Sequence, residues 1–502
     1  MAAPKPPVGG PVAAFLLHKR RTEPMSTLVK LQADGPGTPL PHFWEECVGS
    51  GHASLALRTD WQEQIAIAHD ELGMKRVRFH GIFDDDMSVA YELWGKAHIG
   101  FHNVDIIFDH LVAIGMEPFI EMSFMPSCMA SGTQTIFHYR GNVTPPKDQG
   151  QWRDLCEAFG RHLVRRYGEK RVRGWNFEVW NEPNLGGFWA GTQEQYFELY
   201  RSAAEGLRAA DRELKIGGPA TARDAWVADL IKFCRDNSLP LDFVTTHHYP
   251  TDQALMWEEK AHEKLGYGQR DVIAAWTRDV RKQCGKLPLH YTEWNSSPSP
   301  RDDNHDISFG AAFALHTILG NAGVVDSYSY WTFSDIFEEL GFSSVPFHGG
   351  FGLMTIHGVR KPAWQAFRWL HEAGDRLVQP QIVGDSETVG AYCTRGEHLD
   401  VFAYNFGMPG KDVAEEPVAI EITGAASARA RLGRIEAGRT DPRGAWAEMG
   451  HPDDLWPEQV AELHEAAKVE EEAAEGKAAR GGLRFEFALP PNCLWRLRLP
   501  AR

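Results

Sequence analysis

The chain has 502 residues, of which 43% are hydrophobic and 24% are charged, as in ordinary globular proteins. It carries 52 lysines and arginines against 68 aspartates and glutamates, a net charge of −16. An acidic chain without a basic cluster disfavours nucleic acids and anionic membranes as partners, whereas a small neutral ligand stays compatible with it. The length accommodates one large domain of up to roughly 400 residues together with a small one.

Cysteine usage and hydropathy indicate the compartment. The seven cysteines are scattered without a Cys-x-x-Cys pair, which argues against a disulfide framework or zinc knuckle and predicts reduced thiols in the cytoplasm. No apolar run approaches the ~20 residues of a membrane span. Within residues 1–24 an apolar patch precedes a basic one, the reverse of a secretory signal. We therefore expect a loose tail there, with Met25 as an alternative start.

Amphipathic helical patterns alternate with short β-rich segments through most of the chain. Asp60 and Glu63 form a predicted capping box, and apolar residues follow at helical spacing until Gly73. The same spacing predicts helices over 152–163 and 196–207. This alternation is typical of repeated βα units.

Eight candidate strands are separated by intervals long enough for a helix each. They lie near residues 47–52, 75–81, 116–124, 173–181, 214–219, 241–248, 287–294 and 325–333. Eight such units predict an α/β fold, a (β/α)8 TIM barrel over residues 25–372.

The pattern changes after Gly374. Segments 389–394, 398–404 and 483–489 largely alternate between apolar and polar residues, which predicts a C-terminal β-sandwich accessory domain over 373–502. An N-terminal strand can join its sheet. Residues 456–480 are acidic and alanine-rich, which predicts a solvated helix or loose insertion.

The strongest local motif is Trp-Asn-Phe-Glu-Val-Trp-Asn-Glu-Pro-Asn, which ends the fourth candidate strand. Alternation puts Glu178 and Glu182 on one side, with Glu178 inside the barrel and Glu182 at the carboxyl-terminal rim, where barrel active sites are built. Asn181 beside it can donate to a ligand hydroxyl. The alternative is that Glu182 only caps the following helix.

A second glutamate, Glu293, ends the apolar seventh candidate strand. A charged side chain at a barrel mouth needs a partner or a role, so a structural ion pair is the alternative. Strands four and seven of an eight-stranded ring face each other across the mouth. Glu182 and Glu293 can therefore reach one bond.

Paired carboxylates suit the hydrolysis of glycosides. One carboxylic acid delivers a proton to the leaving oxygen while the other group, ionised, faces the oxocarbenium-like centre. Unequal burial and like-charge proximity separate their pKa values. A spacing of roughly 5–5.5 Å makes such an enzyme retaining, and roughly 6.5–9.5 Å makes it inverting.

The remaining polar motifs predict neither a metal site nor a cofactor. His247 and His248 are adjacent on a strand and point to opposite faces, so they do not readily chelate one ion. Three consecutive aspartates, residues 84–86, are predicted to cap a loop rather than to bind a metal. The chain has no His-Glu-x-x-His, Walker or dinucleotide-type glycine motif.

From Cys47 to the C-terminus the chain resembles glycoside hydrolase family 39, the β-xylosidases and α-L-iduronidases. The resemblance is carried by the motifs Cys47-Val-Gly-Ser-Gly-His52, Arg78-Phe-His80-Gly-Ile-Phe, Trp180-Asn-Glu182-Pro-Asn, Thr292-Glu293-Trp-Asn, Tyr330-Trp331-Thr-Phe-Ser-Asp and Pro346-Phe-His348-Gly-Gly-Phe-Gly352. It implies a TIM barrel, retention of configuration, Glu182 as acid/base and Glu293 as nucleophile. It also supports the accessory β-sandwich.

The resemblance extends to residues around the sugar. It places His247 and Tyr249, which share a strand face, in the pocket, where the phenol can hydrogen-bond the nucleophile. His80 matches the sugar-binding histidine of the family, with a buried structural histidine as the alternative. Asn181 is expected to hold the 2-hydroxyl of the sugar. His305-Asp306 also matches the family, without an assigned role.

Four further residues complete the predicted site. Phe124 and Trp331 end the third and eighth candidate strands and can form an apolar floor under the sugar ring, although ordinary core packing is the alternative. Glu338 and Glu339 match acidic positions that the xylosidase branch uses for sugar hydroxyls. A solvated loop pair is the alternative for them.

We therefore expect a retaining, exo-acting β-D-xylosidase that releases xylose from xylo-oligosaccharides. The closest alternative is an α-L-iduronidase or other family 39 glycosidase, for which Arg301, Arg360 or Lys361 would bind the uronate carboxylate. More remote alternatives are a non-catalytic carbohydrate-binding protein and a metal-dependent hydrolase. Nothing in the sequence indicates the oligomeric state.

Overall fold

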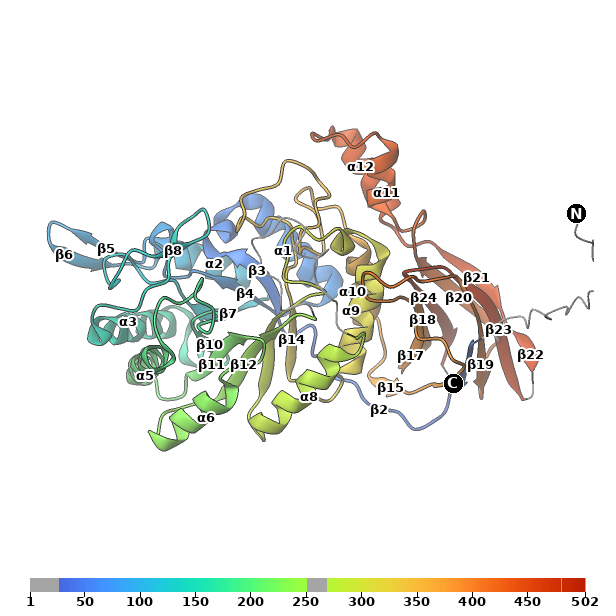
Figure 1. The fold of residues 1–502 in the computed structure, drawn as a ribbon, viewed down its shortest axis with the longest axis horizontal. Coiled ribbons are helices and arrows are strands. Elements are labelled where there is room, and N and C mark those ends of the chain that lie inside the picture. Colours follow the sequence, from blue (N-terminus) through green and yellow to red (C-terminus); the bar gives the residue numbers. More distant parts are fainter. Residues whose placement is uncertain (1–26, 251–268, 480, 502) are drawn as a thin grey trace, which may run out of the picture.

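The computed structural model describes residues 27–250, 269–479 and 481–501. Its centre is a closed barrel of parallel strands in the order β10-β11-β12-β13-β14-β3-β4-β7, with helices around it (Figure 1). The eight predicted barrel strands are confirmed: β3 (Val48–His52), β4 (Arg76–His80), β7 (Glu117–Met122), β10 (Asn176–Val179), β11 (Lys215–Ala222), β12 (Phe243–His248), β13 (Leu289–Trp294) and β14 (Ser327–Tyr330).

The outer helices bury one apolar face each against the barrel strands. Both faces of most strands are therefore buried, and polar strand residues such as Glu178, His247 and Thr292 are buried with the apolar ones. The helices are α1 (Thr59–Leu72), α2 (His102–Ala113), α3 (Gln149–Tyr167), α4 (Glu169–Val172), α5 (Gln193–Ala210), α6 (Val227–Asp236), α8 (Val272–Cys284), α9 (Ser308–Gly320) and α10 (Pro362–His371).

The predicted capping box at the start of α1 is wrong. The helix begins at Thr59, so Arg58 occupies the N-cap position and no side chain caps it. Asp60 lies in the first turn, where Arg58 holds its carboxylate with two hydrogen bonds of 2.9 and 2.7 Å. Gly73 ends the helix with a φ of 69°, as expected for a left-handed C-cap.

Two antiparallel-rich sheets form the accessory domain beside α9 and α10 (Figure 1). One sheet has the order β16-β1-β19-β23-β22 and the other β2-β15-β17-β18-β24-β20-β21. Their strands are β1 (Thr27–Gln32), β2 (Thr38–Pro39), β15 (Arg376–Val378), β16 (Gln381–Val383), β17 (Val389–Arg395), β18 (His398–Asn405), β19 (Glu416–Thr423), β20 (Arg429–Ile435), β21 (Glu471–Glu475), β22 (Lys477–Ala479), β23 (Gly482–Leu489) and β24 (Cys493–Pro500).

The N-terminal strand β1 pairs in parallel with β19, so residues 27–39 belong to the accessory sheets and the barrel begins at Val48. The predicted tail, residues 1–24, and Met25 lie outside the described residues. Between the two bodies, α9 is buried on all sides because the barrel covers one face and the β17-β18-β24 sheet covers the other. In the described part of the chain no helix is both long and apolar enough to span a bilayer.

The acidic segment 456–480 is helical only in its first half, as α12 (Pro457–Ala466). The rest forms β21 and β22, which extend one sheet each. Most of its acidic side chains are exposed, as predicted for a solvated segment. Glu471 of β21 is the half-buried exception, and Arg431 and Arg496 both bind it, at 2.8 and 2.6 Å.

Smaller elements lie in the loops of both domains. The hairpin β5 (Ala90–Leu93) and β6 (Lys96–Ile99) projects from the barrel, and α11 (Pro442–Glu448) projects with α12 from the accessory sheets (Figure 1). Trp446 and Leu463 of these two helices pack on Phe347 and Val359 of the β14–α10 loop. The accessory domain thus braces a loop that belongs to the barrel rim.

Candidate active site

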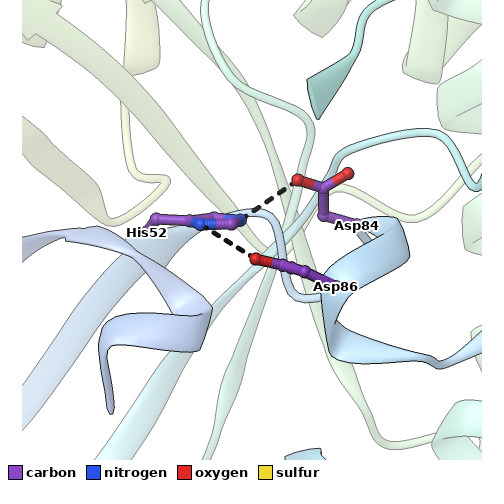
Figure 2. A group of neighbouring side chains, drawn as sticks. All are labelled: His52, Asp84 and Asp86. Atoms are coloured by element: carbon purple, nitrogen blue, oxygen red, sulfur yellow. Dashed lines mark ion pairs between the residues drawn. The ribbon is translucent and has the colours of Figure 1, made fainter. Parts of the chain in front are cut away.

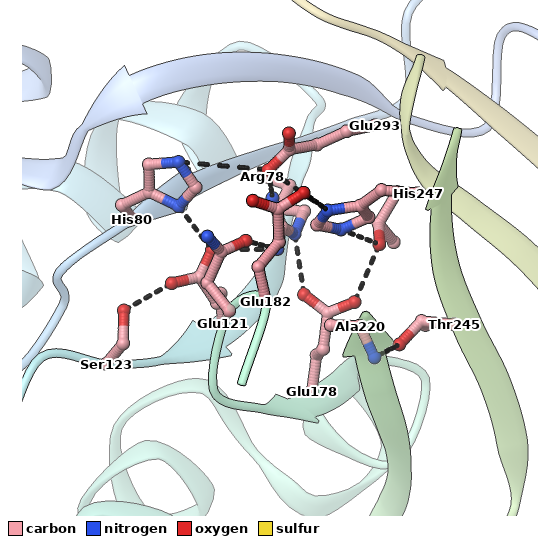
Figure 3. Close-up of polar contacts among 12 residues, drawn as sticks. Arg78, His80, Glu121, Ser123, Glu178, Glu182, Ala220, Thr245, His247 and Glu293 are labelled. Atoms are coloured by element: carbon pink, nitrogen blue, oxygen red, sulfur yellow. Dashed lines mark hydrogen bonds and ion pairs between the residues drawn. The ribbon is translucent and has the colours of Figure 1, made fainter. Parts of the chain in front are cut away.

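Glu182 and Glu293 meet at the carboxyl-terminal mouth of the barrel (Figure 3). Glu293 lies in β13 and Glu182 follows β10 across the ring. One carboxylate oxygen of each and a nitrogen of His247 lie within 4.8 Å of one another. Both glutamates are only 5% exposed. The pair can therefore act on one bond in a site that largely excludes water.

The backbone at Glu182 is left-handed, with a φ of 43°. This conformation disfavours any residue with a side chain and is found at functional sites where the surrounding structure holds it. Here the Glu182 amide donates to the Ala220 carbonyl at 2.8 Å, which ties the loop after β10 to β11. The tight turn directs the Glu182 side chain back over the barrel mouth (Figure 3).

A buried arginine, Arg78 of β4, lies beneath the site and pairs with its carboxylates. Its guanidinium contacts Glu293 at 2.8 Å, Glu178 at 2.6 Å and Glu121 at 2.9 Å, and it donates to Asn181 Oδ1 at 2.9 Å. Glu121 and Glu178 lie opposite each other in the β7–β10 register. Burial opposes the charge of Arg78, but the three carboxylates around it raise its pKa.

Arg78 was not among the predicted site residues. The sequence feature that could have identified Arg78 is a charged residue inside a buried strand. Two other strands carry glutamates that also face the barrel interior. Such a residue needs partners in the barrel interior, since an unpaired buried charge is strongly unfavourable. The pairing depends on strand order, which local sequence does not specify.

Both oxygens of Glu293 hold donors. Oε1 accepts from Arg78, and Oε2 accepts from the Tyr249 hydroxyl at 3.0 Å. Burial raises the pKa of Glu293, while Arg78 and His80 act in the opposite direction. Hydrogen bonds to the carboxylate favour its ionised form, which is the form a nucleophile needs.

His80, the last residue of β4, faces the site with one nitrogen and the barrel with the other (Figure 3). Its Nδ1 contacts Glu121 at 2.7 Å, and its Nε2 lies 3.5 Å from Glu339 and 3.8 Å from Glu293. Although burial disfavours the charged imidazole, Glu121 and then Glu339 raise the pKa of His80 to about 10. His80 and Glu339 thus form a polar pair that can bind sugar hydroxyls.

Aromatic rings wall the site beside His80. Trp331 lies 4.8 Å from His80 between ring centroids, and Phe124 lies 6.3 Å away. Trp331 also packs with Tyr249, Phe337 and Phe351 in a separate buried cluster. Apolar rings therefore lie next to the polar pair, but both are buried, Phe124 at 0% and Trp331 at 2% exposure, so their role under a sugar ring stays a prediction.

The two neighbouring acids Glu338 and Glu339 have different surroundings. Glu339 faces His80, whereas Glu338 contacts His52 at 3.4 Å and His138 at 3.5 Å. The two residues lie in a turn, in which the Gly341 amide donates to the Glu338 carbonyl at 2.8 Å, and their side chains meet different histidines. That both bind sugar hydroxyls stays a prediction.

His52, at the end of β3, is clamped between Asp84 and Asp86 (Figure 2). Its Nε2 lies 3.1 Å from Asp84, and its Nδ1 lies 3.4 Å from Asp86. These three residues have the spacing of a metal site. The carboxylates lie against different ring nitrogens, however, and although burial opposes charge, Asp84 and Glu338 raise the pKa of His52 to about 9. A charged imidazole explains the cluster as ion pairs that hold the β4–α2 and β14–α10 loops.

The two adjacent histidines of β12 have separate partners, as their alternation predicts. His247 contacts Glu182 at 3.0 Å and Thr292 at 3.0 Å, and His248 contacts Asp224 at 2.6 Å on the other face. Glu182, His247 and Glu293 also have ligand-like spacing. The Arg78 guanidinium lies 2.8 Å from Glu293, so this carboxylate already has a positive charge beside it.

His305-Asp306, for which no role was predicted, belongs to a buried support beneath the site. Lys361 Nζ lies 2.6 Å from Asp306 and 2.7 Å from Asp335, and it donates to the Gly350 carbonyl at 2.9 Å. Asp335 in turn accepts from the Gly352 amide at 2.7 Å. This network fixes the loop that carries Phe351 to the aromatic wall. A Cβ at Gly352 would lie 2.4 Å from the Asp335 backbone nitrogen, so only glycine fits.

Comparison with known proteins agrees with this geometry. Residues 27–484 match the model of the family described as glycosyl hydrolases family 39. A "Beta-xylosidase" from Caldicellulosiruptor saccharolyticus is 43% identical over 456 residues, which cover 90% of this chain and 93% of that protein. Another from Geobacillus stearothermophilus is 39% identical over 67% of this chain and 69% of that protein.

Among solved structures, a monomeric β-xylosidase from Caulobacter crescentus superposes with a TM-score of 0.83 at 34% identity, covering 94% of this chain and 99% of the other. The family model spans most of the chain, and the fold and motifs are shared along that length. The chain belongs to glycosyl hydrolase family 39.

Proposed function

We propose that the protein is a retaining, exo-acting β-D-xylosidase that releases xylose from the non-reducing end of xylo-oligosaccharides. The observation that carries the proposal is the approach of Glu182 and Glu293, whose nearest ligand oxygens fall within 4.8 Å. That distance suits direct attack by one carboxylate on the anomeric carbon. An inverting enzyme needs roughly 6.5–9.5 Å so that a water molecule fits between.

In the first step Glu182 protonates the glycosidic oxygen while Glu293 attacks the anomeric carbon and forms a covalent xylosyl ester. The bond to the leaving group breaks with its electron pair on the protonated oxygen. In the second step Glu182 removes a proton from water, the hydroxide oxygen attacks the anomeric carbon, and Glu293 is released as a carboxylate. Arg78 and Tyr249 hold Glu293 in place through both steps.

Asn181 is positioned to bind the 2-hydroxyl. Its Oδ1 is occupied by Arg78, and its Nδ2 is buried without a hydrogen-bond partner in the described structure. An orphaned buried donor is unfavourable until a ligand satisfies it. A sugar hydroxyl next to the reacting carbon supplies that acceptor, and the bond strengthens as charge develops in the transition state.

The charges of the site support a neutral sugar over a uronate. Glu339 lies beside His80 at the sugar position, where it would repel a substrate carboxylate. Of the three cations considered for a uronate, Lys361 is held by Asp306 and Asp335, and Arg360 pairs with Glu71. Arg301 donates to the backbone carbonyls of Pro300 and Gly341. The names of the two relatives above support xylosides as the substrate. The small exposed fraction of both glutamates supports removal of single terminal units.

We also propose a cytoplasmic location. All seven cysteines are free in the structure, and six of them are buried. Oxidising compartments favour paired cysteines, especially in secreted proteins. Fractionation of the native host, with the protein detected by antibody, tests this proposal; recovery in the medium or periplasm would contradict it.

Proton NMR of the reaction with 4-nitrophenyl β-D-xyloside tests the proposed activity. We expect β-xylose to appear first and α-xylose only later, by mutarotation. First appearance of α-xylose would contradict the retaining mechanism. An absence of turnover on the xyloside together with turnover of the α-L-iduronide would contradict the substrate, and the Glu293→Ala variant provides the inactive control.

A further inference from the structure

Four buried residues from three barrel strands form a hydrogen-bonded chain that ends at Glu182. Thr292 Oγ1 donates to Glu178 Oε1 at 2.8 Å. His247 Nε2 lies 3.0 Å from the same Thr292 oxygen, and His247 Nδ1 lies 3.0 Å from Glu182 Oε1 (Figure 3). Glu178, Thr292 and His247 are each 0% exposed. No solvent water can therefore replace a member of the chain without displacing the strands.

The number of hydrogens on each group fixes the direction of every bond in this chain. A threonine hydroxyl has one hydrogen, and Thr292 gives it to Glu178, so toward His247 the hydroxyl can only accept. Nε2 of His247 must then carry the hydrogen. A neutral imidazole has one N–H, so Nδ1 is bare and can only accept.

Two observations support an ionised Glu178 and a neutral His247. Burial raises the pKa of Glu178, but Arg78 favours its ionised form, since Arg78 Nε donates to Oε2 at 2.6 Å. Burial, followed by the positive charges of Arg78 and His80, lowers the pKa of His247 well below its usual value, which keeps the imidazole neutral. Bare Nδ1 has two carboxylate neighbours, Glu182 Oε1 at 3.0 Å and Glu293 Oε1 at 3.6 Å. Only the contact with Glu182 has hydrogen-bond length, and it is a hydrogen bond only when Glu182 carries a proton.

We infer that Glu178 and Thr292 are positioning residues that select the Nε2–H tautomer of His247, and that His247 thereby holds Glu182 in the protonated state from which it acts as the acid. The inference rests on the proposed function, since it assigns Glu182 the acid role. Neither Glu178 nor Thr292 touches the reacting atoms.

The same arrangement serves the second step. Glu182 has one proton, so its transfer to the leaving group breaks the hydrogen bond to Nδ1. The resulting carboxylate faces the lone pair of Nδ1, which is unfavourable. Recovery of a proton from water restores the hydrogen bond, so Glu182 is a stronger base than a solvated glutamate. The charged or titratable groups that also act on this centre are Arg78 and His80 from β4, Glu121 from β7, Glu293 from β13 and Glu339 after β14.

The test compares Thr292→Val, which removes the hydroxyl, with Thr292→Ser, which keeps it. Without an acceptor at Nε2, His247 can turn to the Nδ1–H tautomer and donate to ionised Glu182. In Thr292→Val we expect the alkaline limb of the kcat/KM–pH profile, which reports Glu182, to move down by about 1 pH unit. We expect kcat/KM for xylobiose to fall about 10-fold more than for 4-nitrophenyl xyloside, whose leaving group needs little protonation. Thr292→Ser should retain the alkaline limb.

If Thr292 has only a structural role, Thr292→Val should lower kcat/KM equally for both substrates and leave the alkaline limb in place. That result would overturn the inference. A second measurement needs no Thr292 variant. Nitrogen-15 NMR of histidine-labelled enzyme, with His247 assigned from its absence in His247→Gln, should show the Nε2–H tautomer. An Nδ1–H tautomer or an imidazolium would overturn the inference even if Thr292→Val did not fold.

Failure of the proposed function gives a different result. If Glu182→Ala lost activity equally on xylobiose and on the aryl xyloside, the acid role itself would be wrong. If Glu182→Ala discriminated between the two substrates but Thr292→Val did not, only the positioning role would be wrong.

Discussion

Removal of the Tyr249 hydroxyl should raise the pKa of the proposed nucleophile. The hydroxyl donates to Glu293 Oε2 at 3.0 Å, and the ring packs against Trp331 and Phe351. Tyr249→Phe deletes the donor and keeps the ring, so the aromatic wall survives. Ionised Glu293 loses a hydrogen bond that its protonated form needs less, and its pKa rises.

The magnitude follows from the kind of bond. A hydrogen bond to a charged group is worth about 1.5–3 kcal/mol, and about 1.4 kcal/mol corresponds to one pH unit. Burial already raises the pKa of Glu293, and Arg78 remains on the other oxygen to limit the change. We expect the acidic limb of the kcat/KM–pH profile to move up by roughly 1–2 pH units.

The assay is initial-rate hydrolysis of 4-nitrophenyl β-D-xyloside across the acidic range. Tyr291→Phe is the matched control, because Tyr291 is also a buried tyrosine whose hydroxyl donates to a carboxylate, that of Asp224, at 2.9 Å. Asp224 does not contact Glu293 in the described structure, so the control should keep the acidic limb of the wild type. An acidic limb that stays in place in Tyr249→Phe, or moves down, would refute the reasoning.

Three further substitutions distinguish a residue that takes part in catalysis from residues that stabilise the fold. Glu182→Ala should lower kcat/KM for xylobiose about 100-fold or more but spare aryl xylosides with good leaving groups, measured by parallel kinetics; equal losses would contradict the acid role. Lys361→Met leaves two buried carboxylates unpaired and should lower the free energy of unfolding by about 3–5 kcal/mol in urea, whereas the part-exposed Arg360→Met should cost about 1 kcal/mol or less. Because the pKa of His52 is raised from 6.5 to about 9, its stabilisation is complete below pH 6.5 and is lost as the pH rises through 9; the wild type should lose about 3 kcal/mol more than His52→Gln over that range in urea unfolding, and parallel curves would refute this.

Motifs local in sequence carried most of the prediction. The alternation of apolar strands and amphipathic helices predicted all eight barrel strands, because each unit buries its own faces in the same way. Glu182 and Glu293 stood out because a charge at the end of an apolar strand lies at the barrel mouth by construction. Their approach across the ring then followed from strand order alone.

The contacts between side chains of different barrel strands could not be predicted from local motifs. Arg78 depends on Glu121 and Glu178, which are inward-facing residues of β7 and β10. The different surroundings of Glu338 and Glu339 depend on His52 and His80, which end different strands. Each of these contacts joins residues far apart in sequence, so local patterns carry no trace of them.

The misassigned segment has the same cause. Residues 471–479 are acidic and alanine-rich, a composition that favours helix or solvent exposure. They form strands because arginines of the neighbouring strands, Arg431 and Arg496, neutralise Glu471 and because open sheet edges offer backbone partners. The N-terminal strand, by contrast, joins the accessory sheet as expected: β1 pairs with β19, nearly 400 residues later in the chain.

The sequence by itself determined the barrel, the accessory sheets and the two glutamates that face each other, because hydrophobic periodicity and strand ends are local properties. Only the tertiary structure decided which side chains surround those glutamates. Glu293 lies against Arg78 and Tyr249, and Glu182 lies against His247. The pKa values of the two glutamates depend on distance and burial among side chains from different strands, and these quantities exist only once the barrel has closed.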